Sequence, residues 1–313
     1  MVIRIGTRAS ELARWQAHEV ARLVRAHDPT LDVRLVELTT PGDQLADLPL
    51  ERMEGTGFFT STLERALLDR EIEVAVHSYK DLPVVLTPGL VVAAVPARGP
   101  VEDALCAAGG SRLADLPRGA RVGTSSLRRI AQVRALRPDL ELQPLRGNVP
   151  TRLERVRRGD LDAVVVALAG IARLGLEGHV TEIFPTWDLL PAPAQGALAI
   201  QVREDDAALR RSLCALEDHS VRSAVEAERA VLHALRGGCS VPVGASARAA
   251  GDRVVLEAGV FSPHGDRALR VRVEGDEPAA VGREAAERLL GQGAGQILAD
   301  LERRPMVAPG APR

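Results

Sequence analysis

The chain has 313 residues, with 40 basic and 42 acidic side chains for a formal net charge of −2, and only 2% aromatic residues. This length suggests two or three domains, and the balanced charge gives no global reason to expect nucleic acid or an acidic membrane surface as a partner. The sequence has no signal-peptide pattern, no apolar run near the roughly 20 residues that span a bilayer, and three widely spaced cysteines. We therefore expect a soluble protein of the reducing cytoplasm, without a membrane partner.

The first part of the chain alternates strand-like and helix-like segments. Ser10 is a candidate cap for the first helix. The patterns predict helices at 11–26 and 60–68 and strands at 2–6, 33–38, 72–76 and 90–95. Such alternation is typical of a mostly parallel sheet with helices on both faces.

Two proline-rich seams, at 96–100 and 191–193, divide the chain. Between them the patterns predict helices at 126–136, 151–158 and 171–174 and strands at 121–123, 140–145 and 163–167, and a strand at 197–202 follows the second seam. We expect two doubly wound α/β lobes, the first formed by 1–97 with 197–216 and the second by 101–192. Ligands of such sheets lie at the carboxyl ends of the strands, so the cleft between the lobes is the expected site.

The character of the sequence changes near residue 220. A long helix at 220–235, two or three strands that include 254–261 and 268–273, and a helix from 278 to 290, extending to about 301, predict a small α+β domain at 219–303. The Pro/Ala/Gly-rich tail at 304–313 is expected to be disordered.

Arginines and small polar side chains gather where the predicted strands end. Such positions share one edge of a doubly wound sheet, and guanidiniums beside a helix N-terminus bind carboxylates or phosphates. Any single arginine is more often a solvated surface charge, but together they predict a polyanionic ligand. The group comprises Arg8, Ser10, Thr124, Ser126, Arg128, Arg129, Arg146, Asn148, Arg152 and Arg173.

Lys80 is the sole lysine among the 40 basic residues, and it precedes Asp81 at another strand end. A carboxylate among arginines stays ionised, and it can stabilise a developing cation or move protons at nitrogen. The alternative is a simple Lys–Asp turn pair. His77 is interpreted as a packed strand-end residue, and without an H-x-x-H pattern we expect no catalytic metal.

Cys239 follows two glycines, which give its thiol an accessible backbone setting. A thiolate is a natural nucleophile. A lone cysteine is more often inert core, and Cys106 and Cys214 are interpreted in that way.

Seven segments, distributed over residues 2–303, resemble the porphobilinogen deaminase (hydroxymethylbilane synthase) family in their sequence, order and spacing. They are Ile5–Ser10 with Trp15 and Gln16, Val76–Pro83, Val122–Arg129, Leu145–Asn148, Ala169–Gly175, Gln195–Ala197 and Gly237–Cys239.

The resemblance implies two lobes like a type II periplasmic binding protein and a third domain that carries a cofactor. It implies that Cys239 holds a dipyrromethane through a thioether. It also implies that Asp81 is catalytic in the stepwise deamination and head-to-tail condensation of four porphobilinogen molecules to hydroxymethylbilane. This is a transferase of tetrapyrrole biosynthesis. A monomer that hands its product to uroporphyrinogen-III synthase is the corresponding expectation for partners.

The resemblance also assigns binding residues. Those matching cofactor-binding groups are Asp43, Ser78, Lys80, Thr124, Ser126, Arg128, Arg129 and Arg146. Those matching substrate-binding groups are Arg8, Ser10, Gln16, Arg146, Asn148, Arg152, Arg173 and Gln195.

The chain departs from the family pattern at several points. In the lid-like segment 52–59, Thr56 stands where many members carry lysine, and Pro150 and Ala194 stand where glycine is usual. Thr56 motivates the alternative hypothesis of a catalytically weakened paralogue. The arginines and the two-lobed arrangement are also consistent with a small-anion-binding protein on the same fold, which is a second alternative.

Overall fold

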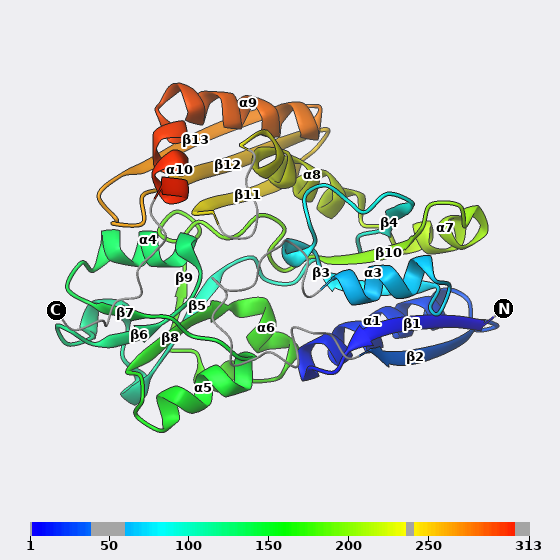
Figure 1. Ribbon diagram of the computed structural model, residues 1–313, viewed down its shortest axis with the longest axis horizontal. Coiled ribbons are helices and arrows are strands. Elements are labelled where there is room, and N and C mark those ends of the chain that lie inside the picture. Colours follow the sequence, from blue (N-terminus) through cyan, green and yellow to red (C-terminus); the bar gives the residue numbers. More distant parts are fainter. Residues whose placement is uncertain (1, 39–59, 236–240, 304–313) are drawn as a thin grey trace.

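The computed structural model describes residues 2–38, 60–235 and 241–303, in which the strands form three sheets (Figure 1). Asp43, the lid-like segment, Cys239 and the tail lie outside the described residues. No helix in the described ranges combines the length and the apolar character needed to cross a membrane.

The first lobe is a five-stranded sheet in the order β2-β1-β3-β10-β4. Four strands share one direction, and β10, which arrives from a distant part of the chain, runs antiparallel between β3 and β4. Buried apolar residues of α1 pack on the sheet, and α3 and α7 complete the lobe. The elements are β1 (Val2–Arg8), α1 (Glu11–His27), β2 (Asp32–Leu38), α3 (Ser61–Leu68), β3 (Val74–Ser78), β4 (Leu90–Ala94), β10 (Leu198–Arg203) and α7 (Ala207–Leu213).

The second lobe repeats this topology in the order β7-β6-β8-β5-β9, with β5 as the antiparallel strand. The chain passes between the lobes twice, before β5 and before β10, so two adjacent crossover segments join them. The elements are β5 (Asp103–Ala107), β6 (Arg121–Gly123), α4 (Leu127–Leu136), β7 (Glu141–Gln143), α5 (Val149–Arg157), β8 (Ala163–Ala167), α6 (Leu168–Arg173) and β9 (Glu182–Phe184).

The third unit is an antiparallel sheet, β11-β12-β13, covered on one face by α8 and α9. Its core is aliphatic, with Val231, Leu256, Val260 and Leu289 buried together. Figure 1 shows this unit above the two lobes. The elements are α8 (His219–Ala234), β11 (Val243–Ala250), β12 (Arg253–Phe261), β13 (Ala268–Gly275), α9 (Pro278–Gly291) and α10 (Ala294–Arg303).

The predicted fold class, two α/β lobes and a small α+β unit, is confirmed. Strands β5 and β9 and helix α7 lie outside the predicted elements, and the single predicted C-terminal helix is two, because the chain turns at Gly293 with φ 98°. The domain boundaries themselves remain a prediction.

Local residue chemistry explains the starts of two helices and marks one strained position in the second crossover. Ser10 Oγ accepts from Ala13 N at 3.3 Å, so the predicted cap of α1 is confirmed. Pro150 lies in the first turn of α5, where its missing N–H costs nothing. Ala194 has φ 62°, the left-handed conformation that suits glycine and costs an L-residue roughly 1–2 kcal/mol.

Candidate active site

The carboxyl ends of β1 and β3 meet at a cavity of about 100 Å³. Asp81, in the short 3-10 turn that follows β3, lines the cavity and is exposed to solvent. Gln16 is buried and donates from Nε2 to Ser78 Oγ at 2.8 Å. The structure therefore brings together five of the sequence-predicted site residues, Arg8, Ser10, Gln16, Ser78 and Asp81.

His77 lines the same cavity, but its ring forms a hydrogen bond with a buried residue of the protein. Its Nε2 lies 2.9 Å from Gln201 Oε1, and Gln201 Nε2 donates to Glu64 Oε1 at 3.0 Å. Because the carboxylate of Glu64 fixes the amide of Gln201, Nε2 of His77 is the donor. Burial lowers the pKa of His77 to about 4, so the ring is neutral at pH 7. The expected packed strand-end histidine is confirmed, and it belongs to a buried polar chain.

The turn that carries Asp81 is held from the third unit. Arg229 of α8 lies over the Tyr79 ring at 4.5 Å from its centroid. Its guanidinium donates to Leu82 O at 3.1 Å and to Pro83 O at 2.6 Å. The position of Asp81 thus depends on a helix more than 130 residues away in sequence.

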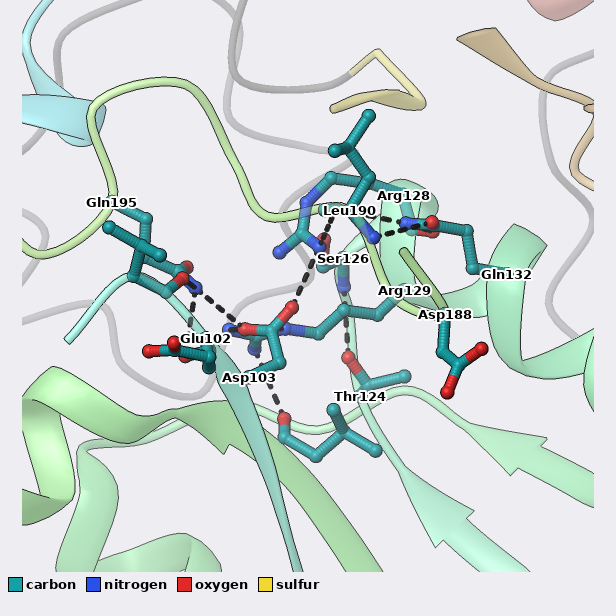
Figure 2. Close-up of polar contacts among 12 residues, drawn as sticks. Glu102, Asp103, Thr124, Ser126, Arg128, Arg129, Gln132, Asp188, Leu190 and Gln195 are labelled. Carbon is teal, nitrogen blue, oxygen red and sulfur yellow. Dashed lines mark hydrogen bonds and ion pairs between the residues drawn. The ribbon is translucent and has the colours of Figure 1, made fainter. Parts of the chain in front are cut away.

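A second polar cluster lies beside the turn, in the second lobe (Figure 2). Asp103 is fully buried at the start of β5 and pairs with Arg128 Nη1 and Arg129 Nη2, both at 2.7 Å. Gln195 Nε2 donates to Asp103 Oδ1 at 2.9 Å, and Gln195 Oε1 accepts from Lys80 Nζ at 3.2 Å. Sequence-predicted residues from three distant segments therefore meet through Asp103, which the sequence analysis did not select.

Charge and burial compete in this cluster. Burial alone would raise the pKa of the Asp103 carboxyl, but Arg128 and Arg129 outweigh it and hold that pKa well below its usual range. Burial lowers the pKa of Lys80 to about 8; the attraction of Asp81 opposes this shift, and the repulsion of Arg129 adds to it. By surface area Lys80 is half-buried, so a ligand can still reach it.

Two further arginines, Arg152 of α5 and Arg173 of α6, are largely desolvated. Burial lowers the pKa of Arg152 to about 10, with repulsion from Arg129 adding to the shift and attraction to Asp81 opposing it. Burial likewise lowers the pKa of Arg173 to about 10. Arg173 donates to Gly196 O at 2.6 Å and lies 5.5 Å from the ring centroid of Trp15. Desolvated guanidiniums favour the arrival of carboxylates.

The remaining predicted residues have mixed local roles. Thr124 is buried, and its Oγ1 accepts from the backbone N of Ser126, the residue that precedes α4. Asn148 caps α5, accepting from Thr151 N at 2.9 Å. Arg146 is half-buried in the loop before that cap. None of these contacts tests the binding roles predicted for them.

The two crossovers between the lobes are tied to the third unit by Glu228 of α8, which is fully buried. Arg98 donates to it twice, from Nη1 and Nη2, at 2.8 Å each. The backbone N–H groups of Ala194 and Ala247 donate to the same carboxylate at 2.6 and 2.7 Å. Glu228 therefore joins both crossovers to β11.

Asp103, Glu228 and Arg229 were not predicted from the sequence. The signal available for Asp103 is an acidic residue opening an apolar strand directly after a proline-rich seam.

Among the described residues, no group of three or more His, Cys, Asp or Glu side chains is placed to hold a metal ion. Cys106 is buried, as expected, and burial raises the pKa of its thiol to about 11. The interpretation of Cys214 as a core residue is wrong, because this cysteine is exposed just after α7.

Two family models match the chain. Residues 3–211 match the porphobilinogen deaminase, dipyromethane cofactor binding domain, and residues 223–291 match the porphobilinogen deaminase, C-terminal domain. Together they cover most of the length, including both lobes and most of the third unit.

Curated relatives agree. The chain is 48% identical over 297 residues to a porphobilinogen deaminase of Desulforudis audaxviator, covering 94% of this chain and 96% of that one. It is 42% identical over 301 residues to that of Brevibacillus brevis, covering 96% and 97%.

Solved structures give more distant similarities. One is the periplasmic aliphatic sulphonate binding protein SsuA of Escherichia coli, with a TM-score of 0.39 at 16% identity, covering 75% of this chain and 70% of that one. Another is the sulfate-bound OxyR2 regulatory domain of Vibrio vulnificus, with a TM-score of 0.43 at 14% identity, covering 69% and 92%.

Proposed function

The chain belongs to the porphobilinogen deaminase family, and we propose that its two clusters at the cleft divide the work of that reaction. The family gives porphobilinogen as the substrate and a dipyrromethane as the cofactor. The proposal assigns Asp81 to the chemistry and the cationic cluster around Asp103 to binding. The observation that carries it is the convergence of Asp81, Arg8, Gln16 and Ser78 on one cavity, next to Lys80.

The donor set fits a dipyrromethane, which carries acetate and propionate side chains. The guanidiniums of Arg128 and Arg129 already bind one carboxylate, that of Asp103, at 2.7 Å. Lys80 and Arg152 are desolvated cations beside them. Arg128, Lys80 and Arg146 would hold the cofactor, with Thr124, Ser126 and Ser78 nearby, and Arg129 would add its positive charge from behind them. When bound, the dipyrromethane supplies the pyrrole to which the first porphobilinogen is joined.

Asp81 acts on the substrate in this proposal. Its carboxylate is exposed and lines the cavity, where it stabilises positive charge at a pyrrole nitrogen as ammonia leaves and the new C–C bond forms. The carboxylates of the incoming unit are oriented by Arg8, Ser10, Gln16, Arg152 and Arg173. Asn148 and Gln195 lie at the edge of this group. The fully buried amide of Gln195 is used inside the protein, which favours a bridging role.

The finer assignments belong to the same proposal. Cys239 is the attachment site, with Asp43 as a further cofactor contact. The enzyme is a transferase that acts as a cytoplasmic monomer and hands hydroxymethylbilane to uroporphyrinogen-III synthase. The weakened-paralogue alternative rests on Thr56 alone, and measured turnover decides it.

Asp81→Asn tests the catalytic assignment. The substitution keeps the shape but removes the charge, so we expect kcat to fall at least about 100-fold, the scale of a lost electrostatic or proton-transfer group, with little change in KM. The formation of the linear tetrapyrrole from porphobilinogen is the measurement. Asp139→Asn, which breaks the Arg137–Asp139 pair at the end of α4, is the matched control. Normal turnover by Asp81→Asn would exclude the role.

A further inference from the structure

Asp103 is the residue around which the predicted anion-binding groups are arranged. It lies at the start of β5, directly after the first crossover, and it has no solvent exposure. Its two carboxylate oxygens contact Arg128, Arg129 and Gln195 (Figure 2).

The two arginines contact Asp103 in different ways. Arg129 uses Nε at 3.1 Å and Nη2 at 2.7 Å for Asp103 Oδ1, and its Nη1 donates to Val165 O. All three nitrogens of Arg129 are therefore engaged by the protein. Arg128 uses Nη1 alone, for Asp103 Oδ2 and Leu190 O at 2.7 Å each. Within the described part of the chain, Nε and Nη2 of Arg128 have no hydrogen-bond partner.

That difference has a chemical meaning. The Nε/Nη2 edge of a guanidinium is a fork that binds a carboxylate through two parallel hydrogen bonds. In Arg129 this edge is taken by Asp103, whereas in Arg128 it remains available. Gln195 extends the arrangement, because its Nε2 donates to Asp103 and its Oε1 accepts from Lys80 Nζ. Besides Asp103 Oδ1, Nε2 has two backbone acceptors, Val101 O at 2.8 Å and Glu102 O at 3.2 Å, and these three contacts fix the direction of the amide.

We propose that Asp103 is a positioning residue, which ties down Arg129 and, through Gln195, Lys80, and leaves the Nε/Nη2 edge of Arg128 to bind a carboxylate of the dipyrromethane. This inference rests on the proposed function for the identity of the ligand, but not for the arrangement of the protein groups. Asp103 does not touch the ligand in this account.

Electrostatics explains why a carboxylate is needed there. Arg128 and Arg129 are 3% and 6% exposed, and Lys80 lies beside them. Buried cations without a counter-ion are costly, and they would repel one another and move apart. One buried carboxylate against three cations holds the cluster together yet leaves it net positive for an incoming polyanion.

Lys80 offers a direct readout, because it is the sole lysine of the chain. Protein grown with ¹³C-lysine gives one side-chain NMR signal, whose pH titration needs no assignment. The charged groups that face Lys80 are Asp81 from its own turn, Asp103 from β5, and Arg128 and Arg129 from α4. The carboxylate of Asp103 favours the protonated amine, so its removal makes the amine titrate at lower pH.

The experiment compares Asp103→Asn with the control Asp139→Asn in the full-length protein. Mass is measured on these proteins as purified, and the titration is done on the same proteins carrying Cys239→Ser, so that no titrated sample holds the covalent cofactor. We expect the Lys80 midpoint to fall by about one pH unit in Asp103→Asn, as for the loss of a nearby opposite charge, and to stay unchanged in the control. An unchanged midpoint in Asp103→Asn overturns the positioning role, whatever the ligand is.

The intact mass of the proteins that retain Cys239 reports cofactor loading. We expect the covalently loaded fraction to fall at least tenfold in Asp103→Asn. If that variant does not fold, Asp103→Asn with Arg129→Gln removes one charge of each sign. The pair restores folding but not loading, because Arg128 has lost its tether; normal loading of the pair contradicts the proposal. Wild-type chain without added mass refutes the proposed function instead, and the Lys80 titration then stands as a separate test.

Discussion

At the scale of single residues, burial determines whether a side chain behind the cavity is neutral or charged. His77 is held as a neutral donor to Gln201, and Gln201 to Glu64, by contacts of 2.9 and 3.0 Å. The ring cannot take a proton without losing the environment that burial imposes. We therefore expect His77 to contribute to the acid sensitivity of the folded protein.

His77 makes the folded protein sensitive to acid. Its pKa is about 4 in the folded protein and about 6.5 when unfolded, so below pH 6.5 the unfolded chain binds the proton more readily. We expect stability to fall by about 3 kcal/mol between pH 6.5 and 4 from this residue alone. Thermal melting against pH measures it. His77→Gln should be less stable at pH 7 but flatter over that range, whereas a change at the exposed His264 should leave the slope as it is.

Ala194 shows how residue chemistry and position interact. It occupies a left-handed conformation at φ 62°, and its N–H donates to Glu228 at 2.6 Å. The sequence analysis flagged it only as a departure from a glycine. Its conformation depends on the crossover geometry and could not be read from the sequence.

At the scale of elements, helix α8 links the third unit to the rest of the molecule. Two consecutive residues, Glu228 and Arg229, bind the crossovers and the Asp81 turn respectively. Helix α8 therefore contacts both the crossovers between the lobes and the turn that carries Asp81.

Breaking the Glu228 contact should destabilise the protein strongly. Glu228→Gln leaves the buried Arg98 without its counter-ion, and we expect a loss of about 3–5 kcal/mol in the free energy of unfolding. Glu284→Gln, which breaks the exposed Glu284–Arg288 pair on α9, should cost less than about 1 kcal/mol.

A double variant separates the ion pair from the junction. Arg98→Met with Glu228→Met removes both charges, but the N–H groups of Ala194 and Ala247 lose their acceptor. Chemical denaturation should find this double variant still destabilised by about 2 kcal/mol or more. Recovery to wild-type stability would show that Glu228 is only half of an ion pair.

How far the elements could be predicted depends on local signal. Apolar periodicity and the Ser10 cap predicted α1 to within one residue at its end. By contrast, β9 is three residues long and half-exposed, and β11 is mainly Ala and Gly with little strand propensity. These strands form because they pair with β5 and β12, which is tertiary information.

The site residues also fall into two groups: those that local sequence signals predict, and those that only tertiary contacts identify. Strand-end positions predicted Arg8, Asp81, Arg128 and Arg129, because topology places such positions at one edge. Asp103, Glu228 and Arg229 act through contacts between different elements, at sequence separations from 19 to 150 residues. No local pattern distinguishes such acids and arginines from the many surface charges of this chain.

At the scale of the whole molecule, the two lobes touch across the cleft through Arg173 and Trp15. Arg173 belongs to α6 of the second lobe and Trp15 to α1 of the first, with 5.5 Å between the guanidinium carbon and the ring centroid. The same Arg173 is a proposed ligand for substrate carboxylates. A carboxylate that takes Arg173 competes with the Trp15 contact, so ligand binding and lobe separation are coupled.

Tryptophan fluorescence tests this coupling. The chain has two tryptophans, and Trp187 is 70% exposed, so Trp187→Phe leaves Trp15 as the single emitter. We expect porphobilinogen to change the Trp15 emission, and Arg173→Gln in the same background to abolish that change. A Trp15 signal that responds equally in both proteins would disprove the link between Arg173 and the ligand.

The central claim, a dipyrromethane held by Cys239 in a porphobilinogen deaminase, is tested most directly by intact mass with tryptic mapping. Trypsin places Cys239 in peptide 237–248, whereas Cys106 and Cys214 fall in peptides 99–112 and 212–222 and serve as internal controls. We predict an excess of two deaminated porphobilinogen units on peptide 237–248 alone. An unmodified chain that stays unmodified after incubation with porphobilinogen, or an excess on either control peptide, would contradict the account.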